Sequence, residues 1–129
     1  MNKKVMKKVD IIIQARTGST RLPGKVLFKL FNKTILEHVI ERLKQVKNKS
    51  EIIISTTILP EDDNIVRICE RNRIKYYRGN EFDVLDRYYH TALENKSEII
   101  VRVTSDCPLV DPGILDTMIE LHEKEKADY

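Results

Sequence analysis

Short runs of β-branched residues alternate with amphipathic helical patterns, and this alternation restricts the chain to few folds. The runs are residues 9–13, 52–54, 74–77 and 98–104. Strands that alternate with helices form βαβ units, in which the strands lie parallel and are buried between helical layers. The first run is almost continuously apolar, as in a central strand covered on both faces. The sequence therefore predicts an α/β fold with a three-layer, Rossmann-like, mostly parallel sheet.

Each helical pattern begins at a recognisable start signal. The signals are the capping box of Thr34 and Glu37, the acidic residues 61–63 after Pro60, Asp83, and the pair Asp111 and Pro112. Residues of these types satisfy the N–H groups of the first helical turn or fit its geometry. Apolar residues at helical spacing should face the sheet. In the last helix these residues are Ile114, Leu115, Met118 and Ile119.

The length and composition of the chain exclude several classes of protein. Its 129 residues suit one folding unit, residues 1–129, with a continuous core. The 23 basic residues nearly balance 20 acidic ones, so no nucleic-acid partner is expected. Cys69 and Cys107 lack the spacing of a zinc site or a disulfide framework, which favours the reducing cytoplasm. The apolar run after the Lys-rich start is too short for a signal sequence or a membrane span.

A polar loop, residues 14–25, follows the first predicted strand and is the main candidate for chemistry. Ligands of open parallel sheets bind beyond the carboxyl ends of the strands. The loop contains the cations Arg16, Arg21 and Lys25, hydroxyl side chains that include Ser19, and the glycines Gly18 and Gly24. Cations and hydroxyl groups bind phosphate oxygens, and glycines let the backbone approach a ligand. These residues favour a triphosphate site over a solvated basic surface loop.

The loop is not a Walker phosphate loop. Five residues separate Gly18 from Gly24, whereas that motif has four, and Val26 stands where a Ser or Thr would hold magnesium. The dinucleotide-binding pattern GxGxxG is absent as well. A triphosphate site of another type is therefore expected.

Three segments resemble the spore coat polysaccharide biosynthesis protein F family of cytidylyltransferases. They are QARTGSTRLPGKVL, RGNEFDVLDRYY and VRVTSDCPLVDP, in this order and each beside the end of a predicted strand. The first and third also resemble the cytidylyltransferases that activate 3-deoxy-manno-octulosonate and acylneuraminate. The resemblance covers nearly the whole chain and implies a glycosyltransferase-A-like nucleotidyltransferase fold. Because members of the family are considerably longer, it also implies a chain truncated at its C-terminus.

The resemblance implies binding of CTP and transfer of CMP to an acidic or phosphorylated sugar, with release of pyrophosphate, for surface or spore-coat polysaccharide. The implied catalytic residues are Arg16, Lys25 and Asp106. The implied nucleotide-binding residues are Gln14, Ala15, Arg16, Gly18, Ser19, Arg21, Lys25, Gly79, Asn80 and Arg87. Asp106 would hold Mg²⁺, for which carboxylate oxygen is a suitable ligand. The alternative for Asp106 is a turn residue before Pro108.

Two other functions remain open. The first is a glycosyltransferase with the same sheet, although the Asp-x-Asp pair typical of such enzymes is replaced by Ser105, Asp106 and Cys107. The second is a nucleotide-binding or oligomerising fragment without catalysis of its own, and a homodimer is one expected form. Asp83 and Asp111 fit helix caps better than ligands.

Overall fold

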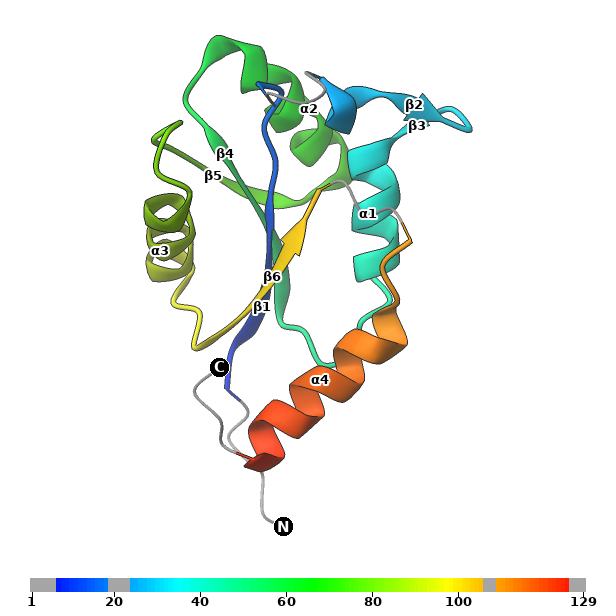
Figure 1. Cartoon of the computed structure of the whole chain (residues 1–129), viewed down its shortest axis with the longest axis vertical. Helices are drawn as coiled ribbons and strands as arrows, with labels where there is room; N and C mark the ends of the chain where they lie inside the picture. Colours follow the sequence, from blue (N-terminus) through cyan, green and yellow to red (C-terminus); the bar gives the residue numbers. More distant parts are fainter. Residues whose placement is uncertain (1–6, 19–23, 106–108, 126–129) are drawn as a thin grey trace.

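A computed structural model describes residues 7–18, 24–105 and 109–125 of the chain. Within these ranges a four-stranded sheet has the order β5-β4-β1-β6, and all its neighbouring strands are parallel (Figure 1). The strands are β1 (Val9–Gln14), β4 (Glu51–Thr57), β5 (Lys75–Gly79) and β6 (Ile99–Thr104). The helices are α1 (Ile35–Leu43), α2 (Asp63–Asn72), α3 (Val84–Asn95) and α4 (Pro112–Glu125).

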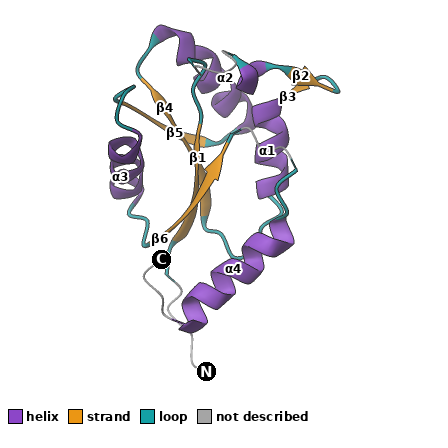
Figure 2. Ribbon diagram, in the orientation of Figure 1, coloured by secondary structure: helices purple, strands orange, loops and turns teal. Residues whose placement is uncertain are grey.

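The sheet lies between two helical layers. Figures 1 and 2 show α3 on one side of the strands and α1, α2 and α4 on the other. The larger core cluster joins the second group of helices to β1 through Ile11 and Ile13, whereas Ile12 packs with Tyr88 and Ala92 of α3. Because successive strand residues point to opposite faces, β1 supplies both cores. The predicted three-layer α/β fold is confirmed.

Strand β1 occupies a central position because both of its faces are apolar. Ile11, Ile12 and Ile13 are all fully buried, and β1 pairs with β4 on one side and β6 on the other. In a parallel sheet the carboxyl ends of all strands lie at one edge. Gln14 is level with Ser55 of β4 and with Thr104 of β6. The loops after the strands therefore gather at this edge.

The capping box predicted for α1 is present. The Thr34 hydroxyl accepts a hydrogen bond from the Glu37 N–H at 3.1 Å, and the Thr34 N–H donates to Oε1 of Glu37 at 3.2 Å. Glu37 also accepts hydrogen bonds from Asn72 and Arg71 of α2. Partial burial alone would raise the pKa of Glu37, but the bonds from Asn72 and Thr34 and the charge of Arg71 outweigh it and lower the pKa. This cap therefore also ties α1 to α2.

Two local features differ from the prediction or were missed by it. In α4, Leu115 and Ile119 are buried as predicted, but Ile114 and Met118 are 59% and 57% exposed, so their predicted inward orientation is wrong. Only one stripe of α4 reaches the core, because the helix covers the sheet from one side. A short hairpin, β2 (Lys29–Leu30) with β3 (Lys33–Thr34), turns through the positive φ angles of Phe31 and Asn32. Phe-Asn is not a common turn pair, so the sequence did not reveal it.

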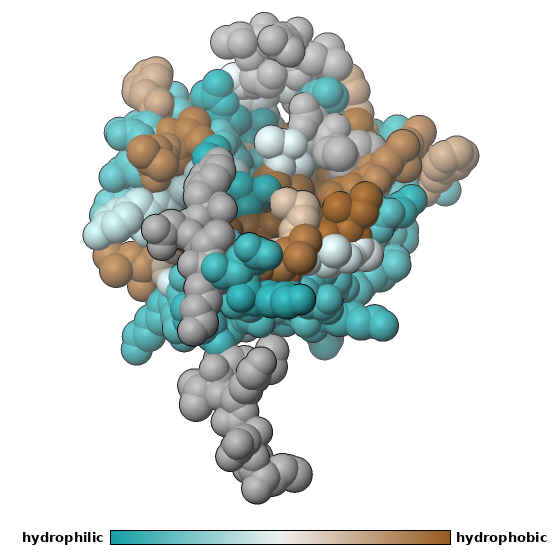
Figure 3. Space-filling model, turned by 60° about the horizontal axis from the view of Figure 1, so that its bottom comes forward, coloured by the Kyte–Doolittle hydropathy of each residue, from teal (hydrophilic) through white to brown (hydrophobic). Residues whose placement is uncertain are grey.

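Strand β6 forms one edge of the described sheet and is only partly covered. Its exposure alternates, with Ile100 and Arg102 exposed and Val103 buried, and the Arg102 guanidinium lies 4.5 Å from the centre of the Tyr88 ring. Figure 3, which brings the lower end of the molecule forward, shows apolar residues (brown) reaching the surface over a broad area. Ile114, Met118 and Leu121 of α4 are among the exposed apolar side chains. In the described residues, no helix combines the length and apolarity that crossing a membrane requires.

Cys69 is buried in the core, and this position makes its thiol unreactive. Burial raises the pKa of Cys69 to about 12, whereas the thiolate is the reactive form. In a Cys107→Ser background, we expect iodoacetamide to modify Cys69 at neutral pH only after the protein unfolds. Mass spectrometry of native and urea-treated samples measures the modification. Rapid labelling of the native protein would contradict the buried position.

Candidate functional site

The loop after β1 is held at the carboxyl edge of the sheet by backbone hydrogen bonds. The Ala15 N–H donates to the Ser55 carbonyl of β4 at 3.0 Å. The Gly24 N–H donates to the Thr17 carbonyl at 2.8 Å, which brings the two described limbs of the loop together. Gly24 has a φ of 76°, a conformation that glycine adopts without strain. Lys25 follows directly and begins a short 3-10 helix, Lys25–Leu27.

A buried carboxylate, Asp62, lies beneath this loop. Its Oδ1 accepts hydrogen bonds from the Thr17 N–H at 2.8 Å and from the Thr17 hydroxyl at 2.9 Å. Its Oδ2 accepts a hydrogen bond from the Thr57 hydroxyl at the end of β4. The side chain of Asp62 is fully buried, as is that of Thr57. Asp62 therefore joins the loops that follow β1 and β4.

Arg87 of α3 reaches the same region and is fully buried. Its Nη1 donates to the carbonyls of Asn80 at 2.7 Å and Glu81 at 3.2 Å. Among the described residues, its Nε and Nη2 have no hydrogen-bond partner. Burial and then the charge of Arg16 lower the pKa of Arg87, while Asp62 opposes this shift. These two donors are unsatisfied among the described residues, and neither is accessible to solvent in this structure.

Gly79 makes room for the Arg87 side chain. A Cβ at Gly79 would lie 3.1 Å from Cγ of Arg87 and 2.9 Å from a ring carbon of Tyr77. Such contacts are shorter than normal van der Waals distances, so a larger residue here would displace Arg87 or Tyr77. Gly79 acts by leaving space for Arg87, in addition to any approach to a ligand.

The structure assigns Asn80 and Asp83 largely to the loop itself. Oδ1 of Asn80 accepts hydrogen bonds from the backbone N–H groups of Phe82 at 2.7 Å and Asp83 at 3.2 Å. The amide nitrogen of Asn80 is then the group that can contact a ligand. Asp83 caps α3 by accepting from the Asp86 N–H at 2.9 Å, which confirms the predicted cap. Asp111 likewise accepts from the Gly113 N–H at 2.8 Å at the start of α4.

The remaining predicted residues have different positions. Gln14 is the last residue of β1 and is partly buried, and Ala15, the next residue in the chain, is buried. Gly18 lies against the short 3-10 helix Pro60–Asp62 that precedes α2, because a Cβ there would be 3.2 Å from Oε1 of Glu61. Arg16 is partly buried and close enough to Arg87 to affect its pKa. Ser19, Arg21 and Asp106 lie outside the described residues.

Sequence reasoning did not identify Asp62, Thr17 or Thr57 as part of this site. Asp62 was interpreted only as one of the acidic residues that begin a helix, which is the common role of such a run. Of its neighbours, Glu61 is exposed and Asp63 is partly buried. Since all three residues are acidic, the sequence offers no signal that only the middle side chain is buried. Only the packing of two loops distinguishes it.

The carboxyl edge brings several cations together, with the carboxylates of Glu61 and Asp62 beside the same loop. Arg16 and Arg87 lie near each other, and Lys25 directly follows Gly24, whose N–H is bound to the Thr17 carbonyl. Of the described carboxylates at this edge, that of Asp62 is buried. Several cations at one edge, one of which (Arg87) has two donors without a described partner, suit a ligand with several negative oxygens. No group of three or more His, Cys, Asp or Glu in the described ranges can hold a metal.

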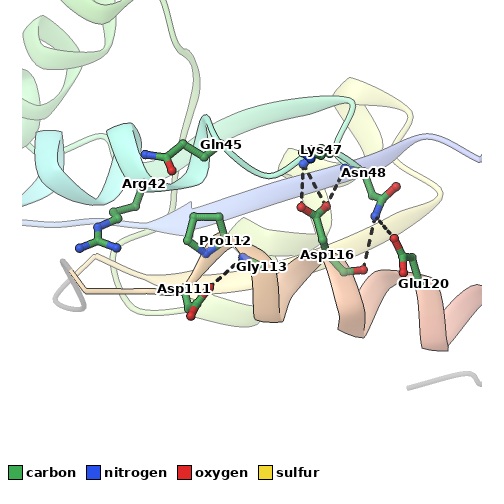
Figure 4. Close-up of a pocket in the computed structure, with 9 residues that line it drawn as sticks. All are labelled: Arg42, Gln45, Lys47, Asn48, Asp111, Pro112, Gly113, Asp116 and Glu120. Atoms are coloured by element: carbon green, nitrogen blue, oxygen red, sulfur yellow. Dashed lines mark hydrogen bonds between the residues drawn. The ribbon is translucent and has the colours of Figure 1, made fainter.

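A cavity away from this edge lies between α1, the residues after it and the start of α4 (Figure 4). Its main acidic group, Asp116, already accepts hydrogen bonds from the N–H groups of Lys47 at 2.9 Å and Asn48 at 2.8 Å. Burial would raise the pKa of Asp116, but these N–H donors outweigh it and lower the pKa. These contacts dock α4 on the loop before β4, so this cavity has a structural explanation.

Known proteins share both the sequence and the fold of this chain. The model of a family described as cytidylyltransferase matches residues 11–129. The spore coat polysaccharide biosynthesis protein SpsF of Bacillus subtilis is 38% identical, with 96% of this chain and 53% of the relative covered. A cytidylyltransferase structure from Leptospira borgpetersenii superposes with a TM-score of 0.86 and 43% identity, covering 89% of this chain and 48% of the other.

A more distant structure, CMP:2-keto-3-deoxy-manno-octonic acid synthetase complexed with CTP, has a TM-score of 0.81 and 27% identity, covering 94% of this chain and 49% of the other. This chain spans about half the length of the curated relatives that it matches. The family match covers nearly every residue of the chain, and the superposed fold covers 89% of it. The resemblance noted from the sequence motifs is confirmed, and the chain belongs to the cytidylyltransferase family.

Proposed function

We propose that this chain forms the CTP-binding part of an enzyme that transfers CMP from CTP to an acidic or phosphorylated sugar and releases pyrophosphate. The observation that carries the proposal is the buried Arg87, with unpaired donors beside Arg16, at the carboxyl edge of a cytidylyltransferase sheet. A solved structure with this fold contains CTP, and its name includes a sugar acid. Synthesis of surface or spore-coat polysaccharide is the process we assign, by similarity to SpsF.

In this proposal the loop after β1 binds the triphosphate. Arg16 and Lys25 neutralise phosphate oxygens, with Ser19 and Arg21 contributing further donors. Attack on the α-phosphorus places more negative charge on its oxygens and on the departing pyrophosphate. Cations held in place before the reaction stabilise this charge without reorganising. The interactions of these cations with the phosphates are therefore strongest in the transition state, where the negative charge develops.

The remaining proposed contacts lie on either side of this loop. The backbone of Gln14, Ala15 and Gly18 approaches the nucleotide on one side, and Gly79, Asn80 and Arg87 contact it on the other. The Nε and Nη2 groups of Arg87 form two parallel donors, which match adjacent acceptor atoms of the nucleotide once the residues that cover them move aside. A sugar oxygen then attacks in line, and no covalent intermediate with the protein is required.

We assign Mg²⁺ to Asp106. Magnesium commonly binds one or two carboxylates together with substrate phosphates and water, so a large cluster of acidic residues is not needed. Asp62, the buried carboxylate described at this edge, is occupied by Thr17 and Thr57 and does not suit this role. Bound Mg²⁺ would neutralise and orient the phosphates. In this proposal the residues of the chain itself bind the phosphates and exclude water from them.

A nucleotide-binding fragment without catalysis of its own is the second candidate, favoured by the half-length match to the relatives. A homodimer is compatible with either form, and we place both in the cytoplasm without nucleic-acid or membrane partners. Measuring pyrophosphate release from CTP with candidate sugar acids separates the two candidates. Release of a nucleoside diphosphate from a nucleotide sugar would instead indicate a glycosyltransferase.

The proposed nucleotide preference predicts a selective thermal shift. CTP with Mg²⁺ should raise the melting temperature, and UTP, ATP and GTP should raise it much less. A ligand at about 100 times its Kd stabilises the native state by about 2.7 kcal/mol, which a thermal-shift assay detects readily. Equal shifts with all four triphosphates would remove the cytidine assignment. No shift with any of them would remove the proposed function.

A further inference from the structure

We infer that Asp62 is a positioning residue, which sets the shape of the nucleotide-binding loop by holding Thr17. This inference rests on the proposed function, because it concerns the loop that would bind the triphosphate. Asp62 belongs to another element, at the start of α2, and would itself touch neither nucleotide nor sugar. Its effect would pass through its hydrogen bonds to Thr17, whose carbonyl in turn accepts a hydrogen bond from the Gly24 N–H.

The orientation of Asp62 is unusual for its place in the helix. Asp62 stands at the N-cap of α2, where an Asp side chain commonly accepts a hydrogen bond from the first helical turn. Here the side chain makes no such bond and points instead to the loop after β1. Burying a carboxylate is unfavourable unless hydrogen bonds compensate. Its three hydrogen bonds, all to threonines, supply that compensation and connect separate loops.

The backbone of Thr17 connects Asp62 to two of the cations of the loop, Arg16 and Lys25. The Thr17 N–H and hydroxyl donate to Asp62, and the Thr17 carbonyl accepts from the Gly24 N–H. Arg16 precedes Thr17, and Lys25 follows Gly24 in the chain. Fixing Thr17 therefore fixes the backbone on which both cations are mounted. Cations that are correctly placed before the ligand binds cost less to organise.

The second carboxylate oxygen of Asp62, Oδ2, is hydrogen-bonded to the sheet. Its Oδ2 accepts from Thr57, the last residue of β4, and the Thr57 hydroxyl also accepts from the Leu59 N–H at 3.2 Å. Arg78 of β5 donates to the Thr57 carbonyl at 2.7 Å and the Leu59 carbonyl at 2.8 Å. The segment before α2 is thus braced by two strands. Asp62 can fix the position of Thr17 because Thr57 and the backbone around it fix the position of Asp62.

Charge and positioning predict opposite effects when Asp62 is changed, which makes the inference testable. Removing a negative charge near Arg16 and Arg87 would by itself favour an anionic ligand. Losing the anchor of Thr17 would instead weaken binding. In Asp62→Asn, Oδ1 can still accept from Thr17, and Nδ2 can donate to the Thr57 hydroxyl. Asp62→Ala loses both the charge and the anchor.

The experiment measures the Kd of CTP with Mg²⁺ by isothermal titration calorimetry on folded protein. We expect Asp62→Ala to raise the Kd about tenfold or more, and Asp62→Asn to remain within about threefold of the unchanged protein. Asp63→Ala is the matched control, because it removes a neighbouring carboxylate that pairs with Arg78 and not with the loop. An unchanged or lower Kd in folded Asp62→Ala would overturn the inference.

Two further measurements keep the test decisive. Amide hydrogen exchange without ligand should show faster exchange at Thr17 and Gly24 in Asp62→Ala, and unchanged exchange would also overturn the inference. This readout does not require CTP binding, so it separates failure of the inference from failure of the proposed function. If Asp62→Ala does not fold, Thr17→Val removes only the hydroxyl bond to Asp62. It should raise the Kd by several-fold, and an unchanged Kd would count against the anchor.

Discussion

Replacing Lys25 with Ala is expected to weaken CTP binding by roughly 10- to 100-fold, since a charge-assisted hydrogen bond contributes about 1.5–3 kcal/mol. Lys25 directly follows Gly24, whose N–H is bound to the Thr17 carbonyl, so its backbone is anchored before the ligand arrives. A flexible lysine on a mobile backbone would lose more entropy on binding and contribute less. In a form of the protein that turns over, pyrophosphate release should fall by about 10²–10³-fold, as on removal of one preorganised charge donor.

Lys29→Ala is the matched control for this experiment. Lys29 lies in β2, four positions further along the chain, and is exposed on the hairpin. Its removal changes the net charge by the same amount as Lys25→Ala, so both variants share any long-range electrostatic effect. Calorimetric titration with CTP and Mg²⁺ should show near-normal affinity for Lys29→Ala. Equal affinities in the two variants would show that Lys25 makes no specific phosphate contact.

Arg87→Met is expected to separate stability from nucleotide binding. The change removes a buried cation whose Nε and Nη2 are unpaired in the described structure, and Met retains much of the side-chain volume. Replacing a poorly compensated buried charge with an apolar residue is often neutral or stabilising. The melting temperature without ligand should therefore stay the same or rise. The CTP affinity should fall by about tenfold or more, because a two-donor contact is lost.

Two other variants help to interpret this result. Arg67→Met is the matched control, because Arg67 is exposed on α2 and its side-chain hydrogen bond in the described part of the chain goes to Asn64 of the same helix. It should change neither the melting temperature nor CTP affinity appreciably. Arg87→Lys retains the charge but not the planar pair of donors, so it should bind CTP poorly as well. Full affinity in Arg87→Met would show that Arg87 does not contact the nucleotide, and a large fall in its melting temperature would show that its Nη1 hydrogen bonds stabilise the fold.

Residue patterns predicted most of the fold because periodicity reports which faces are buried. The continuous apolar run of β1 indicated a central strand, and Thr34 with Glu37 marked the start of α1 correctly. The same reasoning failed where burial depends on the position of an element. Ile114 and Met118 have the spacing of a core stripe, but α4 lies at the outside of its layer and leaves them exposed. Periodicity identifies an apolar face and does not reveal how much of it another element covers.

The sequence by itself determined the α/β class, the family and the loop that carries Arg16 and Lys25, because these follow from local patterns and motifs. The tertiary structure alone decided that the buried side chain of Asp62 points to the loop after β1 and that Arg87 is buried with unpaired donors. Asp62 lies 45 residues from Thr17 in the chain, so their contact depends on the parallel pairing of β1 with β4. Burial and hydrogen-bond partners arise from packing between distant segments, which local residue types do not specify.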